Sequence, residues 1–170
     1  MNIDFITKKL QSHKDIFKSL LLNLTLEEYL WKPDSEKWCQ LEIVCHLYDE
    51  EREDFRIRIK QILENPELPL PPADPAAWVT ERRYVEQNYE AKLENFLIER
   101  DNSIEWLQSL DAPKWDNTHI HPTAGPISAE FILTNWLAHD YLHIKQITRT
   151  KYDYLKYYSG HSLDYAGEWK

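Results

Sequence analysis

The sequence predicts an all-α protein, folded as a four-helix bundle with a long proline-rich connection between its second and third helices. Three observations lead to this prediction. Only three glycines occur among 170 residues, which is few for a turn-rich β fold. Four long segments repeat apolar residues at intervals of three and four, the pattern of a helix with one buried face. Five prolines within residues 65–78 exclude a continuous helix there and predict an extended connection.

The composition narrows the class of protein. Hydrophobic residues make up 42% and charged residues 29%, which is typical of a folded globular chain. The net charge of −9 argues against nucleic acid as the main partner, because nucleic-acid-binding proteins usually carry a basic stripe. No apolar run approaches the roughly 18 residues that span a membrane, and the first residues lack a signal-peptide layout, so we expect a cytoplasmic protein. Cys39 and Cys45 are too few for a disulfide framework and are expected to be reduced thiols.

The first helix is expected over residues 4–24. Its buried stripe is formed by Ile6, Leu10, His13, Phe17, Leu20 and Leu24. A histidine inside such a stripe predicts a hydrogen-bonded core residue, and the alternative is that His13 lines a pocket. The following residues 25–28 (TLEE) have the capping-box pattern and predict a short helical turn that ends before Pro33.

The second helix is expected over residues 40–64 and the third over residues 80–110. In the second helix, Asp54 and Arg58 are spaced for an ion pair one turn apart, worth about 0.2–0.5 kcal/mol. The apolar faces are formed in the second helix by Val44, Leu47, Tyr48, Phe55, Ile59 and Ile62, and in the third by Val85, Tyr89, Leu93, Phe96, Leu97, Ile104, Leu107 and Leu110.

A loop is expected over residues 111–126, and Ser128 can cap a fourth helix that runs to about residue 150. Residues 1–150 then form a single bundle domain. Residues 151–170 carry five tyrosines and Trp169. We expect this tyrosine-rich tail to pack on the same domain, and the alternatives are that it covers a pocket or forms a dimer contact.

Two histidines of the fourth helix, His139 and His143, lie one turn apart and differ by only about 40° around the helix axis. They sit at the inner edge of the buried stripe. Neutral imidazoles at this spacing can both reach one divalent ion. The same spacing also occurs where histidines only pack against a core or lie at a solvated edge.

A third histidine, His46 of the second helix, makes a metal site the better explanation. It lies away from the centre of its own apolar stripe and shares a sector with Glu50 and Glu53. Three histidines from two helices with an open coordination position are typical of a reactive metal site, whereas structural zinc sites usually close with four protein ligands. We therefore predict a metal site formed by His46, His139 and His143.

Other polar residues are weaker candidates. Glu50 lies one turn beyond His46 and could orient a ligand or act as a base, and the alternative is a solvated acid. Glu53 is expected to be solvated. His119 and His121 would point the same way in an extended segment, where they could line the mouth of the site, supply a fourth ligand or be solvated. Cys39 lies about two turns from His46, near 10 Å along the axis, and is not expected to be a ligand of the same ion.

Two stretches together resemble the DinB superfamily, including its YfiT-like branch, described as metal-dependent hydrolases. They are "EKWCQLEIVCHLYDEE" (36–51) and "GPISAEFILTNWLAHDYLHIKQI" (125–147). In that family a tryptophan and a short polar turn precede the helix with the first histidine, and the last bundle helix carries the HxxxH pair, usually followed by a glutamine, as Gln146 is here. The resemblance covers about residues 3–150. Asp140 stands where the family often has glutamate, and all three ligand positions are filled.

The resemblance implies an up-down-down-up bundle that binds a divalent ion, zinc or nickel, with iron or manganese as alternatives. Dimers are common in the family. Its members include thiol-dependent transferases and isomerases that use bacillithiol or mycothiol, and the DinB-like part of ergothioneine-synthesising enzymes binds iron through a similar triad. We expect a metal-dependent S-transferase or hydrolase whose substrate is a small molecule, such as a low-molecular-weight thiol. The alternatives are a non-catalytic metal-binding or stress-related binding module, and a bundle whose histidines hold no metal.

Overall fold

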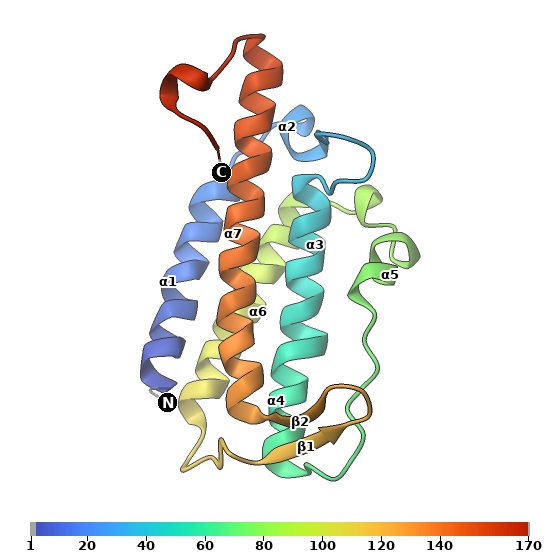
Figure 1. Cartoon of the computed structure of the whole chain (residues 1–170), viewed down its shortest axis with the longest axis vertical. Coiled ribbons are helices and arrows are strands. Elements are labelled where there is room, and N and C mark those ends of the chain that lie inside the picture. Colours follow the sequence, from blue (N-terminus) through green and yellow to red (C-terminus); the bar gives the residue numbers. More distant parts are fainter. Residues whose placement is uncertain (1–2, 170) are drawn as a thin grey trace.

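A computed structural model describes residues 3–169 and confirms a four-helix bundle (Figure 1). The long helical segments are α1 (Ile3–Leu21), α3 (Gln40–Glu50) with its continuation, α6 (Tyr89–Ser109) and α7 (Ala129–Ser159). Helices α1 and α7 run in one direction, and α3 and α6 run in the other (Figure 1). The topology is therefore up-down-down-up, as the resemblance implies. It requires the proline-rich connection to return along the bundle before α6 begins (Figure 1).

The second bundle helix is interrupted by a π-helical turn. Helix α3 passes through this turn, Glu51–Phe55, into α4 (Arg56–Glu64). A π turn inserts one extra residue into an α-helix and changes which side chains face each neighbour. The apolar pattern of the sequence predicts the helix over residues 40–64 correctly but does not reveal this turn.

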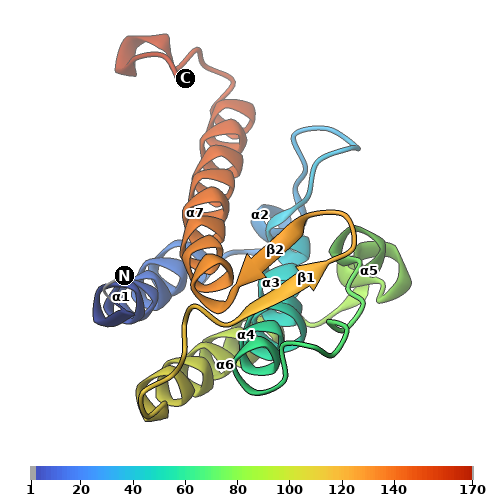
Figure 2. The same ribbon diagram turned by 60° about the horizontal axis from the view of Figure 1, so that its bottom comes forward.

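Shorter elements connect the long helices. Helix α2 (Leu26–Leu30) begins with the expected capping box, in which the backbone N–H of Thr25 donates to Glu28 at 2.7 Å. The strands β1 (Thr118–His121) and β2 (Gly125–Ser128) pair antiparallel as a hairpin. Figure 2 shows this hairpin across the end of the bundle, where α7 begins.

The third bundle helix begins later than expected, at Tyr89 and not near residue 80. Residues 75–81 form a separate helix, α5 (Pro75–Glu81), in which Asp74 accepts a hydrogen bond from the N–H of Ala77 at 3.0 Å. Proline is tolerated in a first helical turn, so the proline-rich segment is not extended to its end. Arg83 then takes a left-handed backbone conformation with φ of 50°, and the 3₁₀ turn Tyr84–Glu86 precedes α6. These breaks separate α5 from α6.

The expected loop and the expected end of the fourth helix also needed correction. Part of the loop over residues 111–126 forms the hairpin. Helix α7 does not stop near residue 150 but continues to Ser159, where Gly160 caps it with φ of 65°. No proline or glycine interrupts the sequence between these positions. The first part of the expected tail is therefore helical, and its later part folds back so that the Trp169 ring lies 5.2 Å from the Tyr152 ring. Residues 1–2 and 170, at the ends of the expected domain and tail, lie outside the described residues.

The interior contains two apolar clusters. One lies toward the end of the bundle where α3 begins, and the other toward the end where α7 begins (Figure 1). Major members of the first are Phe17, Leu21, Ile43, Leu47, Tyr89, Phe96 and Ile147, and of the second Leu10, Ile59, Ile62, Ile104, Leu107, Leu133 and Trp136. Among the helices of residues 3–169, none combines the length and the apolar character needed to cross a membrane.

Between the two apolar clusters, a group of buried ionisable side chains connects the helices. Each long helical segment contributes one of them: His13, Glu51, Arg100 and Asp140. Every N–H of the Arg100 guanidinium has an acceptor. It bonds Glu51 at 2.8 and 2.9 Å, Asp140 at 2.6 and 2.8 Å, and the carbonyl oxygen of Leu10 at 3.4 Å. His13 Nδ1 lies 3.1 Å from Asp140, so His13 is the hydrogen-bonded core histidine expected from its position. We call these four residues the ion layer.

The two carboxyl groups of the ion layer respond differently to burial. Burial acts to raise the pKa of Asp140, but Arg100 and His13 outweigh it and the pKa is lowered. The pKa of Glu51 is raised, because burial, with the charge of Asp140 as a smaller cause, outweighs the opposing effect of Arg100 and Ser103. The indole N–H of Trp136 also donates to Glu51 at 3.0 Å. Both carboxyl groups therefore depend on Arg100 as their main charged partner.

Replacing Arg100 with methionine should lower the free energy of unfolding by about 3–5 kcal/mol, because two buried carboxyl groups lose their partner. Urea unfolding followed by circular dichroism measures this. The control is Arg149→Met, which removes an exposed pair with Asp153 and should cost less than about 1 kcal/mol. Equal effects of the two substitutions would contradict the role of the ion layer.

Candidate metal centre

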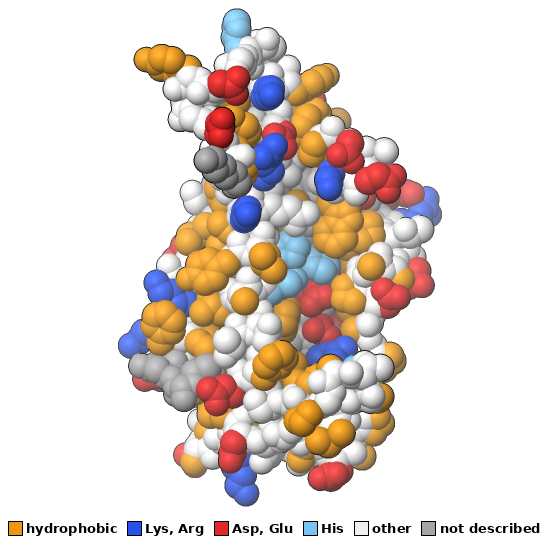
Figure 3. Space-filling view, viewed as in Figure 1, with side chains coloured by type: hydrophobic (Ala, Val, Ile, Leu, Met, Phe, Trp, Pro, Cys, Tyr) orange, Lys and Arg blue, Asp and Glu red, His pale blue; other side chains and the backbone are white. Residues whose placement is uncertain are grey.

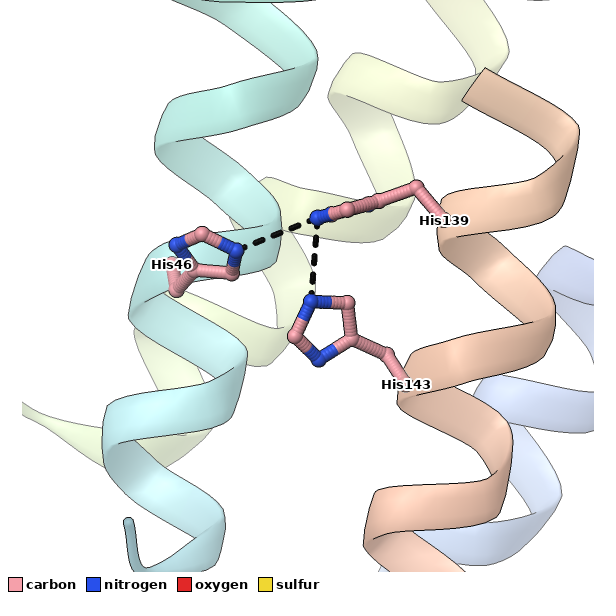
Figure 4. A group of neighbouring side chains, drawn as sticks. All are labelled: His46, His139 and His143. Carbon is pink, nitrogen blue, oxygen red and sulfur yellow. Dashed lines mark hydrogen bonds between the residues drawn. The ribbon is translucent and has the colours of Figure 1, made fainter. Parts of the chain in front are cut away.

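The three predicted histidines come together between α3 and α7. Their Nε2 atoms point toward one common position (Figure 4). Nε2 of His139 lies 3.2 Å from Nε2 of His46 and 3.0 Å from Nε2 of His143. One nitrogen from each ring lies within 4.8 Å of the others. The i,i+4 spacing on α7 and the facing position on α3 thus produce the cluster expected from the sequence.

Hydrogen bonds between the rings cannot explain this geometry. Nε2 of His139 carries either one proton or one lone pair, so it can make one good hydrogen bond to another imidazole. It nevertheless lies at contact distance from two ring nitrogens. A cation that accepts a lone pair from each ring removes the conflict. Tetrahedral ligands with Zn–N bonds of 2.0–2.1 Å stand about 3.3 Å apart, close to the distances between these nitrogens. The donor set therefore fits a divalent metal ion.

The three imidazoles are kept neutral. Burial, with the neighbouring His143 as a smaller cause, lowers the pKa of His46 to about 3. Burial and the other two histidines lower the pKa of His139 to about 2. Burial also lowers the pKa of His143, although Gln146 and Asp140 act in the opposite direction. Metal ligation requires neutral imidazole, so these rings offer lone pairs at physiological pH.

Aromatic packing helps to position the rings. The Trp38 ring lies 4.9 Å from the His46 ring, and the Phe55 ring lies 5.1 Å from the His139 ring. Nδ1 of His46 is buried and has no hydrogen-bond partner within residues 3–169. In most metal sites this second nitrogen donates to a neighbouring group. Here ring contacts contribute to the orientation that hydrogen bonds usually provide.

The cluster is open on one side. His46 and His143 are buried and His139 is partly exposed. Figure 3 shows histidine side chains in a hollow on the face of the molecule where α3 and α7 lie, with acidic side chains directly below them. A small molecule can therefore approach the position toward which the nitrogens point.

Two consecutive glutamates on the second bundle helix have different surroundings. Glu51 belongs to the ion layer, whereas Glu50 has the carboxyl group of Asp54 as its acidic neighbour. Burial, followed by the charge of Asp54, raises the pKa of Glu50 to about 8. Glu50 is 5% exposed, so the alternative of a solvated acid is wrong. Its role as a base stays a prediction. Glu53 does not join the site but pairs with Arg82 at 2.7 Å.

The remaining candidates lie elsewhere. His119 Nδ1 donates to the carbonyl oxygen of Pro66 at 2.8 Å, and His121 Nδ1 accepts from the backbone N–H of Ala124 at 3.2 Å. Neither belongs to the cluster, because the hairpin holds both at the end of the bundle. The alternative that one of them supplies a fourth ligand is therefore wrong. Cys39 and Cys45 are free and buried, as expected of reduced thiols. Burial raises their pKa values to about 11 and about 12, which makes them poor nucleophiles.

The ion layer is the feature next to the site that sequence analysis missed. Asp140 follows His139 directly, and Glu51 follows Glu50. The signal was present, because each ion-layer residue occupies a position of an apolar stripe. Arg100, for example, stands between Phe96 and Ile104 at helical spacing. A charged residue at such a position indicates a buried partner of opposite charge.

Known proteins resemble this chain in sequence and in fold. A sequence profile of the DinB superfamily matches residues 9–147. The solved structure of YfiT from Bacillus subtilis is described as a probable metal-dependent hydrolase with an unusual four-helix bundle topology. It matches with a TM-score of 0.78 and 20% sequence identity, over 94% of this chain and 89% of that chain. No curated protein matches the sequence.

Alanine at His46, His139 or His143 should remove most of the bound metal, because two remaining imidazoles hold an ion much more weakly than three. Elemental analysis of protein purified without a histidine tag, after supply of zinc, nickel, iron and manganese, measures the metal content. His121→Ala is the matched control and should retain the content of the unmodified protein. Less than a tenth of an equivalent in the unmodified protein, or unchanged content in His46→Ala, would contradict the assignment.

Proposed function

Because the chain belongs to the DinB superfamily, we propose that it is a metal-dependent enzyme that acts on a small molecule, as a thiol-dependent S-transferase or as a hydrolase. The observation that carries this proposal is the convergence of three neutral imidazole nitrogens at an open hollow. The description of YfiT as a probable metal-dependent hydrolase supports hydrolysis. The resemblance to thiol-dependent relatives supports transfer from a low-molecular-weight thiol.

The metal would be held by Nε2 of His46, His139 and His143, as zinc or nickel, or alternatively iron or manganese. Imidazole suits all of these ions, so the donor set alone does not select among them. Three neutral ligands leave the charge of a divalent ion uncompensated. When bound, such an ion acts as a Lewis acid that lowers the pKa of a coordinated water to about 7 and keeps a coordinated thiol deprotonated.

The protein's own residues would orient the substrate and supply protons. The rings of Trp38 and Phe55, which contact the histidine rings, offer apolar walls for the substrate. The buried carboxyl of Glu50, one helical turn after His46 on α3, is the candidate for proton transfer. A homodimer, a cytoplasmic location, and the absence of nucleic-acid and membrane partners stay predictions.

A non-catalytic metal-binding or stress-related module is the second candidate. An activity screen tests the proposed enzyme and separates it from this binding module. The metal-loaded protein is offered a small thiol with a bimane electrophile and, separately, a set of simple esters and amides. We expect turnover that disappears on chelation, returns with the ion and is absent from His46→Ala. Turnover that survives complete chelation would contradict a metal-dependent reaction. A stoichiometric ion without turnover on any substrate offered would favour the binding module.

A further inference from the structure

Two acidic side chains lie one turn apart on the second bundle helix beside the histidine cluster. Glu50 is buried and Asp54 is half-buried. Two ionised carboxylates in such surroundings repel one another, and burial disfavours their charged forms, so a state in which one of the two holds a proton is favoured. We call Glu50 and Asp54 the carboxyl pair.

The proton belongs to Glu50. Burial raises the pKa of Asp54, but its ion pair with the guanidinium of Arg58 opposes this and favours the ionised form of Asp54, whereas no cation pairs with Glu50 among the ion pairs of residues 3–169. Arg58 is also held from a second element, because it donates to the carbonyl oxygen of Pro71 at 3.3 Å. Glu50 is 5% exposed and has the ionised Asp54 as its neighbour, so burial and like charge both favour its neutral form.

Other charged groups nearby are already engaged. Asp49 accepts a hydrogen bond from the hydroxyl of Tyr84 at 2.7 Å and pairs with Arg82 at 2.7 Å. Glu51 turns away from Glu50 into the ion layer, where it pairs with Arg100. Across the hollow, α7 presents the neutral rings of His139 and His143. Asp54 is thus the charged neighbour that acts most strongly on Glu50.

The position of Glu50 suits a reaction at the histidines. It lies four residues after His46, so both side chains project from the same face of α3 with a rise of about 6 Å between them. Both are buried, and acidic side chains lie directly below the histidines in the hollow (Figure 3). A molecule bound where the ring nitrogens converge would therefore lie beside this carboxyl group.

We propose that Glu50 is the proton donor of this site, and that Asp54 and Arg58 are positioning residues that keep the proton on it. This proposal rests on the proposed function. It also changes the role suggested by the sequence, since a carboxyl group that holds its proton starts the reaction as an acid and not as a base.

The same proton cycle serves both candidate reactions. In hydrolysis, the bond between the electrophilic carbon and the leaving group breaks. The hydroxyl of water bonds the carbon, the leaving group takes the proton of Glu50, and Glu50 regains the proton that water loses. In S-transfer, sulfur of the thiol bonds the carbon, the leaving group takes the proton of Glu50, and the thiol proton returns to Glu50. Neither cycle needs an oxidant or a reductant, and each ends with the proton back on Glu50.

The first experiment detects the proton directly. Infrared spectroscopy of the unmodified protein at pH 7, with and without bound metal, should show the C=O stretching band of a protonated carboxyl that is absent from Glu50→Gln. The matched control is Glu53→Gln, which alters the same helical region outside the site and should keep the band. A band that persists in Glu50→Gln, or that is missing from the unmodified protein, would overturn the assignment of the proton.

The second experiment tests the donor role. Glu50→Gln should retain its full metal content and lose about 100- to 10,000-fold in kcat, which is the usual contribution of an acid–base group. Glu53→Gln should keep the rate. Normal metal content with an unchanged rate in Glu50→Gln would overturn the donor role and leave the proposed function intact. No turnover by the unmodified protein, with metal bound and the band present, would instead overturn the proposed function, and the donor role with it.

The third experiment separates positioning from mere stability. Activity should fall as the pH rises through the pKa of Glu50, because the protonated form is the active one. Asp54→Asn removes the neighbouring negative charge and offers an amide donor to an ionised Glu50, so it should move this fall to lower pH. An unchanged pH profile in Asp54→Asn would overturn the positioning role.

Discussion

The structure depends on one buried guanidinium. Arg100 of α6 bonds a carboxyl group from the π-helical turn and another from α7, and the latter also contacts His13 of α1. All four bundle helices thus meet at one set of directional bonds, whereas apolar contacts alone would tolerate rotation or sliding of a helix. The ion layer fixes how each helix is rotated about its own axis, because a different rotation would leave a buried charge without its partner.

This constraint explains the position of the site. Glu51 and Asp140 point into the ion layer, so the residues directly before them, Glu50 and His139, must leave the helix in other directions. His46 and Glu50 then follow one face of α3, and His139 and His143 follow one face of α7. The hollow between these faces combines electron-pair donors with a buried acid. Stability and function are therefore linked through adjacent residues, and the ion layer orients groups that it does not itself contact.

The fold was largely predictable because the periodicity of apolar residues records which helical faces are buried. The same logic identified His46, which stands off the centre of its stripe, and the pair on the fourth helix. The breaks around residues 75–88 were not predictable in this way, because they depend on the helix caps Asp74 and Asn88 and on Pro75 at the first position of α5, whose roles depend on the local backbone. The hairpin that carries His119 is too short for a pattern, and the π turn leaves the apolar spacing almost unchanged. Arg100 was visible in its stripe, but its partners lie on other helices, which one sequence does not bring together.

The three imidazoles are placed to share one divalent ion at an open position. X-ray absorption spectroscopy of the metal-loaded protein can verify this arrangement, because multiple scattering from imidazole rings counts these ligands separately from oxygen donors. We predict three imidazole nitrogens at about 2.0–2.1 Å if the ion is zinc, completed by oxygen and without sulfur. A sulfur ligand, or a shell with no more than one imidazole, would contradict the account.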